Sequence, residues 1–352
     1  MTNVKDTFSI FDGHNDALLA ISCGGEQAER EFLDGGSDYQ LDLPKAKAGG
    51  FVGGLFAIFI PRESGRDVDE LRAVKTLSPP VGFERSVVVA NQQLNALYRL
   101  AANSFGRFAV CASVQEIIQH EHQDAIAAVA HLEGAEPIAA DLSNLEEWYG
   151  RGVRSIGLAW SRPNVFGWGV PLRFPSSPDI GQGLSYAGKE LTRQCRRLGI
   201  LVDVSHLNEE GFWDVAKIGG GPIVASHSNV HAICPSARNL TSEQLSCIAD
   251  TDGLVGVCFN TADLYPDGAS DTTRPLDTLL DHIDALLNQI GETRVGIGSD
   301  FDGCPIPDVI GTASGLTHLI VAMQARGYSQ STIKRIAHDN WLRVLDAVWV
   351  KG

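Results

Sequence analysis

The amino-acid sequence predicts an α/β protein, a (β/α)8 barrel of the TIM type with long loops at the carboxyl ends of its strands. Short runs that are nearly all apolar recur eight times between residues 7 and 300, as expected of parallel strands buried on both faces. Polar, helix-like segments alternate with these runs, which is typical of βαβ units. Eight such units favour a closed barrel over a doubly wound sheet, and no GxGxxG motif follows the first run.

In chain order, each predicted strand is followed by a segment that can return the chain to the start of the next strand. The predicted strands are residues 7–12, 54–60, 127–133, 153–160, 199–206, 222–228, 254–260 and 295–300. The predicted helices are residues 85–103, 188–198, 208–218, 241–250 and 275–290, with a C-terminal cap at 329–337 and 340–348. Two long connections, residues 61–83 and 161–184, are expected to be binding loops. No linker interrupts the chain, so residues 1–352 are predicted to form one domain.

Composition and charge exclude several classes of protein. With 44% hydrophobic and 20% charged residues, the 352-residue chain is neither disordered nor a coiled coil. Its 28 basic and 43 acidic residues give a net charge of −15, which argues against nucleic acids and membrane surfaces as partners. Seven cysteines without a CxxC pair, and an N-terminus without an apolar signal core, predict a reduced protein of the cytoplasm.

The first predicted strand leads into His14 and Asp16. In an extended segment, residues two apart project to the same side. A neutral imidazole and a carboxylate that converge in this way form half of a site for a divalent metal. Taken alone, the pair has a simpler explanation, a solvated loop aspartate beside a capping histidine.

Four further predicted strands place ligand-type side chains at their carboxyl ends. These side chains are Glu133 on the third strand, His206 on the fifth, His227 on the sixth and Asp300 on the eighth. Because the carboxyl ends of barrel strands meet on the face where active sites of this fold lie, we expect the six residues to converge. The alternative is that each is a satisfied polar residue at a strand terminus.

Three histidines and three carboxylates favour two metal ions per chain over one. A mononuclear catalytic zinc uses three protein ligands, whereas two ions ~3.5–4 Å apart need a carboxylate between them. Glu133, on the third strand, is the natural bridge. Zinc suits imidazoles combined with carboxylates best, but manganese or iron accepts the same set.

An ordered set of short motifs also runs nearly end to end through the chain. Through these motifs the chain resembles the membrane (renal-type) dipeptidase family of zinc metallopeptidases, in the amidohydrolase superfamily. The resemblance implies a binuclear (β/α)8 homodimer that cleaves dipeptides, often with a D-residue at the C-terminal position. The motifs are Asp12-Gly13-His14-Asn15-Asp16, Leu43-Pro44-Lys45, Gly49-Gly50-Phe51-Val52-Gly53-Gly54, Glu133-Gly134, Gly152-Val153-Arg154, Asp203-Val204-Ser205-His206, Ser226-His227-Ser228, Arg238-Asn239, Ser299-Asp300-Phe301-Asp302-Gly303 and Asn340-Trp341-Leu342-Arg343.

The resemblance implies a metal role for five residues. His14 and Asp16 would hold one zinc ion, His206 and His227 would hold the second, and Glu133 would bridge them. A hydroxide between the two cations would be the nucleophile, since two positive charges lower the pKa of the water from which it forms.

Two further roles follow from the same resemblance. Asp300 would orient the hydroxide, take its proton and pass that proton to the departing amine. Arg238 would grip the C-terminal carboxylate of the substrate, for which a planar guanidinium offers bidentate geometry. Without the resemblance, Arg238 would be interpreted as one half of a surface salt bridge.

Two positions depart from the family pattern. The fourth strand of the family commonly ends in Thr-His-Ser, whose histidine helps to stabilise the oxyanion, but Trp160 stands at that place here. Indole can donate one N–H but cannot carry a positive charge. Arg162 or Asn164 in the next loop are candidates to stabilise the oxyanion instead. Trp160 is expected to line and narrow the substrate pocket. The loop above it contains the aromatic residues Phe166, Trp168 and Phe174. Asn260 replaces a residue that is tyrosine in some relatives, and it is a further candidate for substrate binding.

Three functions are consistent with these residues. The first is a metal-dependent dipeptidase that acts on free dipeptides, including L-Xaa-D-Xaa. The second is a metal-dependent amidohydrolase that acts on N-acyl amino acids or on another small amide or lactam. The third is a barrel that binds metal and a ligand without turnover, although the complete ligand set and Asp300 argue against it.

Overall fold

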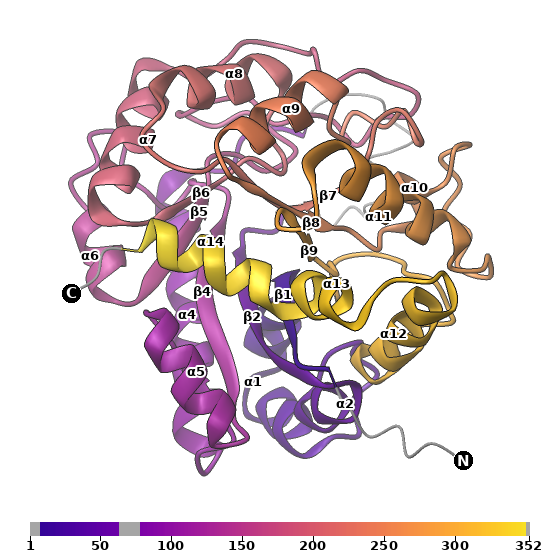
Figure 1. Cartoon of the computed structure of the whole chain (residues 1–352). Coiled ribbons are helices and arrows are strands. Elements are labelled where there is room, and N and C mark those ends of the chain that lie inside the picture. The colour runs from indigo at the N-terminus through magenta and orange to yellow at the C-terminus, as the bar shows by residue number, and fades with distance from the viewer. Residues whose placement is uncertain (1–7, 63–77, 350–352) are drawn as a thin grey trace, which may run out of the picture.

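The computed structural model describes residues 8–62 and 78–349, in which nine parallel strands form one sheet. Eight of them close into a barrel in the order β2-β1-β9-β8-β7-β6-β5-β4, with β2 pairing β4 to complete the ring. The barrel strands are β1 (Ile10–Asn15), β2 (Phe51–Phe59), β4 (Ile126–Glu133), β5 (Val153–Gly157), β6 (Leu201–Asp203), β7 (Val224–Ser228), β8 (Leu254–Val257) and β9 (Val295–Ile297). The predicted (β/α)8 fold is therefore confirmed (Figure 1).

Each of the eight predicted strands overlaps one barrel strand. The first begins at Ile10 rather than at Thr7, which lies outside the described residues. The sequence analysis missed β3 (Phe108–Val110), which pairs with the first residues of β4, while β5 pairs with the last ones. With three residues, β3 is too short for its apolar pattern to stand out.

Helices surround the barrel (Figure 1). They are α1 (Ala17–Asp34), α2 (Leu43–Gly49), α4 (Phe83–Asn103), α5 (Val114–His122), α6 (Leu145–Gly150), α7 (Tyr186–Leu198), α8 (Glu209–Ile218), α9 (Ser242–Asp250), α10 (Thr261–Leu264), α11 (Asp277–Ile290), α12 (Leu316–Ala325), α13 (Gln330–Lys334) and α14 (Asn340–Val348). Local signals set several helix starts: Thr241 and Gln244 form a capping box at α9, and Ser185 caps α7. All five predicted helices between the strands are present, and a π-helical turn, Arg335–Asp339, joins α13 to α14.

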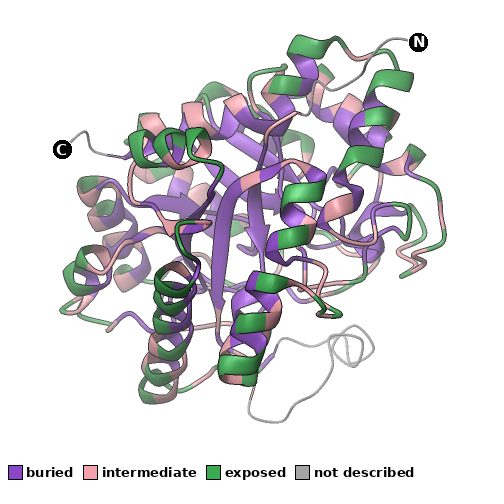
Figure 2. Cartoon of the chain, turned by 90° about the horizontal axis from the view of Figure 1, so that it is seen from below, coloured by how far each residue is buried: buried purple, intermediate pink, exposed green. Residues whose placement is uncertain are grey.

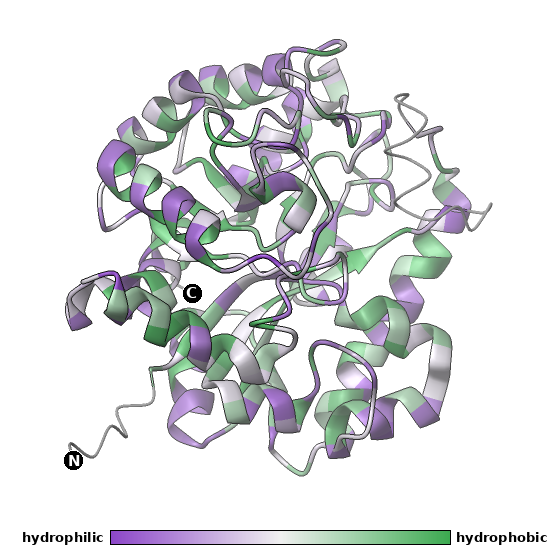
Figure 3. Cartoon of the chain, turned by 90° about the vertical axis from the view of Figure 1, so that its right-hand side faces the viewer, coloured by the Kyte–Doolittle hydropathy of each residue, from purple (hydrophilic) through white to green (hydrophobic). Residues whose placement is uncertain are grey.

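The strands form the buried centre of the molecule, and the exposed residues lie on the outer faces of the helices (Figure 2). The helices carry both hydrophilic and hydrophobic residues, as an outer layer that packs on a core must (Figure 3). None of the helices within the described ranges combines the length and the hydropathy that crossing a bilayer requires.

Helix α14 lies across one end of the barrel and closes it (Figure 1). Its Trp341 is fully buried and packs with Phe11 and other residues near the starts of the strands. The Trp341 indole donates to the carbonyl oxygen of Ile297 at 2.8 Å, and a Cβ on Gly13 would overlap the ring. With the amino-terminal end of the barrel filled in this way, the carboxyl ends of the strands remain as the place for a site.

Candidate active site

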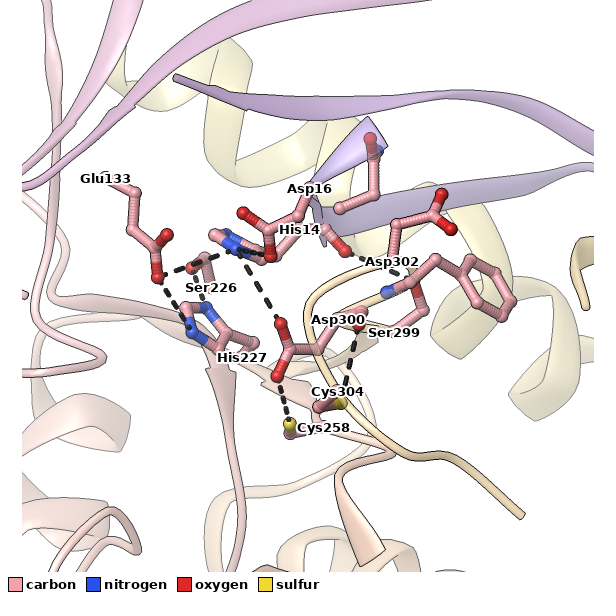
Figure 4. A network of polar contacts seen from close by, with 12 residues as sticks. His14, Asp16, Glu133, Ser226, His227, Cys258, Ser299, Asp300, Asp302 and Cys304 are labelled. Carbon is pink, nitrogen blue, oxygen red and sulfur yellow. Dashed lines mark hydrogen bonds and ion pairs between the residues drawn. The ribbon is translucent and has the colours of Figure 1, made fainter. Parts of the chain in front are cut away.

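The six predicted ligand-type residues converge at the carboxyl ends of the strands. β1 carries His14 and leads into Asp16, and β4 ends at Glu133. The other three are His206 after β6, His227 on β7 and Asp300 after β9. Figure 4 shows His14, Asp16, Glu133, His227 and Asp300 pointing toward one another from four strand ends.

Glu133 lies at the centre of this cluster. Its Oε1 atom is 2.9 Å from His206 Nε2, 3.7 Å from His14 Nε2 and 3.8 Å from His227 Nε2. His14 Nε2 is also 3.4 Å from Asp16 Oδ2, and the Nε2 atoms of His206 and His227 are 3.0 Å apart. Imidazole nitrogens therefore face carboxylate oxygens and each other, which is the arrangement of groups that share cations.

Three groups of residues in the described chain have ligand atoms close enough to hold one ion each. Two of these groups share Glu133: His14 with Asp16 on one side, and His206 with His227 on the other. The third group joins Asp300 to His14 and His227. The donor set is the one that zinc and similar divalent ions prefer. Both ring nitrogens of His14 are buried without a hydrogen-bond partner, which is costly unless a cation binds there.

Burial and charge shift the pKa values of the cluster in directions that suit cations. Burial lowers the pKa values of His206 and His227 well below their usual range, and the nearby Arg238 lowers them further, so both rings are neutral. Burial raises the pKa of Glu133 well above its usual range, and the charge of Asp16 adds to this. Burial works against a charged His14, but the charges of Glu133, Asp16 and Asp300 outweigh it and raise its pKa to about 10. Without a cation, the negative charge of the carboxylates is offset mainly by protonation of His14.

A layer of hydrogen bonds behind the cluster orients the ligand-type rings. Ser161 Oγ lies 2.9 Å from His206 Nδ1, and Ser226 Oγ lies 2.8 Å from His227 Nδ1. Asp203 accepts in turn from Ser226 Oγ at 2.5 Å. With the Nδ1 atoms engaged in this way, the Nε2 atoms of both rings face Glu133.

Asp300 sits on a turn whose backbone conformation is unusual for an aspartate. Its φ is +61°, in the left-handed region, and its N–H donates to the carbonyl oxygen of His14 at 3.0 Å. A Cβ on Gly303 would overlap the carboxylates of both Asp16 and Asp300, so a larger residue there would displace these two side chains. Burial raises the pKa of Asp300 to about 6, and the charge of Asp16 adds to it while His14 opposes it. A carboxylate near this value suits proton transfer close to neutral pH.

A pocket of about 340 Å³ opens directly over the cluster. It includes Arg238, Trp160 and Asn260, so all three predicted substrate-binding residues lie at the site. Five residues that the sequence analysis did not single out also line it: Leu19, Phe59, Pro61, Arg62 and Leu172. Only proximity in the fold identifies them, since none carries a motif of its own.

Arg238 is buried in the pocket wall, with 6% of its surface exposed. Its Nη2 donates to the carbonyl oxygen of His227 at 3.1 Å, while its Nη1 is buried and has no partner among the described residues. The surface salt bridge considered above is therefore wrong. A guanidinium that is fixed in the pocket wall, and whose charge no ion pair among the described residues neutralises, is suited to an anionic group of a ligand.

Asn260 lies in the pocket wall, but its amide is engaged within the protein. Its Nδ2 donates to Asp263 Oδ2 at 2.9 Å, and its Oδ1 accepts from the backbone N–H of Ala262 at 3.3 Å. Asn260 is the N-cap of α10, so its position reflects a helix start as well as the pocket.

Neither neighbour suggested as a replacement for the missing histidine reaches the pocket. Arg162 is fully buried behind Trp160, where its Nε donates to Glu136 Oε1 at 2.6 Å. The Asn164 amide donates to the carbonyl oxygen of Leu158 and accepts from two backbone N–H groups of its own loop. Loop 161–184 does reach the pocket, but through Leu172 rather than through its aromatic residues.

A (β/α)8 barrel with such a ligand cluster at the carboxyl ends of its strands is an arrangement that metal-dependent hydrolases use. Within that class, the chain is a member of the membrane dipeptidase family (peptidase family M19), whose sequence profile matches residues 1–350. The family and the ligand cluster together identify the chain as a metallopeptidase.

Similar proteins cover between 73% and 98% of the chain. A crystal structure of a metallopeptidase from Rhodobacter sphaeroides, liganded with a phosphinate mimic of the dipeptide L-Ala-D-Ala, is 42% identical with a TM-score of 0.95, covering 98% of this chain and all of that one. A Klebsiella pneumoniae protein named for the pqqA 5' region is 46% identical over 258 residues, which are 73% of this chain and 95% of that protein. The dipeptidase aclJ of Aspergillus oryzae is 29% identical over 347 residues, 96% of this chain and 77% of that protein.

Proposed function

We propose that this protein is a dipeptidase that hydrolyses free dipeptides with two zinc ions per chain. The observation that carries the proposal is the pair of ligand groups that share Glu133 on the floor of a pocket containing Arg238. The Rhodobacter sphaeroides structure, with its mimic of L-Ala-D-Ala, supports dipeptides of the L-Xaa-D-Xaa kind as substrates.

His14, Asp16 and Glu133 would hold one ion, and Glu133, His206 and His227 the other. Bound there, divalent cations would supply Lewis-acid polarisation and would acidify water at neutral pH. Zinc suits this mixture of neutral imidazoles and carboxylates, and manganese or iron fits the same ligands.

Asp300 is the proposed group for proton transfer. It faces His14 through Oδ1 at 3.9 Å, and it lines the pocket on the side of the cluster. Its carboxylate would accept the proton of the attacking water as the water oxygen bonds to the carbonyl carbon, and would donate that proton to the amine nitrogen as the C–N bond breaks.

Arg238 is the proposed anchor for the C-terminal carboxylate of the substrate. We expect Arg238→Ala to lower kcat/KM for a free dipeptide by about 10²-fold, the effect of losing one or two charge-assisted hydrogen bonds. The same substitution should change kcat/KM for the dipeptide amide far less, because the amide offers no carboxylate to pair with. Steady-state kinetics on both substrates measure these two effects. Arg238→Lys is the control, because lysine keeps the positive charge but not the bidentate geometry of the guanidinium. Equal losses on both substrates would assign Arg238 a structural role.

A substrate panel tests the proposed function itself. Metal-reconstituted protein is offered L-Xaa-L-Xaa and L-Xaa-D-Xaa dipeptides beside N-acyl amino acids and small lactams. The proposal expects the dipeptides to be the best substrates. A preference for N-acyl amino acids would instead support the amidohydrolase alternative.

We further propose that the protein works in the cytoplasm, as one domain and as a homodimer. All seven cysteines are free in the structure, which suits a reducing compartment. The single barrel, closed by α14, supports one domain. The homodimer rests on the family resemblance alone, and light scattering of the purified protein tests it.

A further inference from the structure

Trp160 brings an indole N–H, a hydrogen-bond donor, to the wall of the pocket. Trp160 lines the pocket and is 8% exposed. Its N–H donates to no described residue, and it is not among the polar atoms that are buried without a partner. The N–H is therefore not enclosed by the described residues, and the pocket that Trp160 lines is where a ligand could reach it.

The ring of Trp160 is held in place from several sides. Its centroid is 4.9 Å from that of Phe59 and 5.8 Å from that of His206. The guanidinium carbon of Arg162 stacks behind it, 5.1 Å from the Trp160 centroid and 5.5 Å from the Phe59 centroid. Arg162 is itself fixed by Glu136 and by the carbonyl oxygen of Ile60, at 2.8 Å. A donor that is fixed before the substrate binds costs little reorganisation during the reaction.

Other donors in the pocket wall are engaged elsewhere. The Asn260 amide donates to Asp263, and His206 uses Nδ1 toward Ser161 and Nε2 toward Glu133. Arg238 is directed to the substrate carboxylate in the proposed function. Arg62 also lines the pocket, and it is the competing donor that the experiment below must separate from Trp160.

We infer that the Trp160 N–H donates a hydrogen bond to the carbonyl oxygen of the scissile peptide as that oxygen becomes negatively charged. Attack by an oxygen nucleophile turns a planar carbonyl into a tetrahedral oxyanion, and a donor aimed at this oxygen stabilises the transition state more than the ground state. The inference rests on the proposed function, since it requires a peptide or amide substrate.

The test is Trp160→Phe, which removes the donor and keeps an aromatic ring against Phe59 and Arg162. We expect kcat/KM for a dipeptide to fall by about 10²-fold, mostly in kcat. The Ki of a phosphinate dipeptide mimic, whose tetrahedral oxygens resemble the oxyanion, should rise by a similar factor. Metal content and melting temperature should stay close to those of the wild type.

Matched variants separate a donor from a packing residue. Trp160→His, which restores an N–H, should recover much of the phosphinate affinity. Trp213→Phe, on α8, makes the same substitution away from the site and should behave as wild type. An unchanged phosphinate Ki in Trp160→Phe would overturn the inference, and so would a tenfold or larger rise in Ki confined to Arg62→Gln. If the wild-type protein cleaves no dipeptide, the proposed function is contradicted. If the wild type and Trp160→Phe are equally active on dipeptides, only the role of Trp160 is contradicted.

Discussion

Asp300→Asn should bind the same number of metal ions as the wild type and lose about 10²–10⁴-fold in kcat, the usual contribution of a group that transfers protons. The amide keeps the shape of the side chain but cannot accept the proton of the attacking water. Asp300 also has an oxygen near His14 and His227, so the structure allows it a second role as a metal ligand. Metal analysis beside kinetics distinguishes the two roles.

The matched control is Asp302→Asn, on the same turn. Asp302 accepts from the backbone N–H groups of Gln40 and Leu41, at 2.6 and 3.2 Å, and belongs to none of the ligand groups among the described residues. We expect a smaller loss of kcat there because Asp302 belongs to no ligand group, although an asparagine oxygen can accept from only one of these two N–H groups, which bond to different Asp302 oxygens. Near wild-type turnover by Asp300→Asn would show that Asp300 is not the base, and loss of metal would show that it is a ligand.

Glu133→Gln should cost at least one metal equivalent and on the order of 10³-fold in kcat/KM, which corresponds to several kcal/mol of transition-state stabilisation. Glu133 belongs to both metal groups that do not include Asp300, and its Oε1 atom approaches three imidazoles. A neutral amide cannot neutralise two cations. Full metal content with normal activity would contradict a shared role for Glu133.

Metal-free protein provides a second test of Glu133. Burial raises the pKa of Glu133 well above its usual range, so its ionised form is destabilising in the fold without metal. Metal-free Glu133→Gln should therefore melt at a higher temperature than metal-free wild type at pH 8. The gap should narrow as the pH falls and Glu133 takes up a proton. A lower melting temperature for the variant at pH 8 would contradict this account.

The barrel could be predicted because its signal is repeated. Eight apolar runs and the polar segments between them each point to the same architecture, and errors at single boundaries do not change it. β3 could not be predicted because a pattern of only three residues can equally come from a turn or a helix end. The strand ends likewise place His14, Glu133 and His227 on one face by the geometry of the fold alone.

The walls of the pocket could not be predicted in the same way. Leu19, Phe59 and Leu172 come from different parts of the chain, and only the tertiary fold brings them together. Arg162 was considered as a pocket donor because it follows Trp160 closely, but ion pairing with Glu136 holds it behind the Trp160 ring. Proximity in sequence does not say which face of a wall a side chain occupies.

The stoichiometry of metal at full activity tests the central claim most directly. Metal-free protein is titrated with zinc, and elemental analysis is combined with dipeptide hydrolysis at each point. The two ligand groups that share Glu133 predict that bound zinc approaches two equivalents per chain and that activity reaches its plateau only as the second equivalent binds. Full activity with a firm ceiling of one equivalent would contradict the binuclear site.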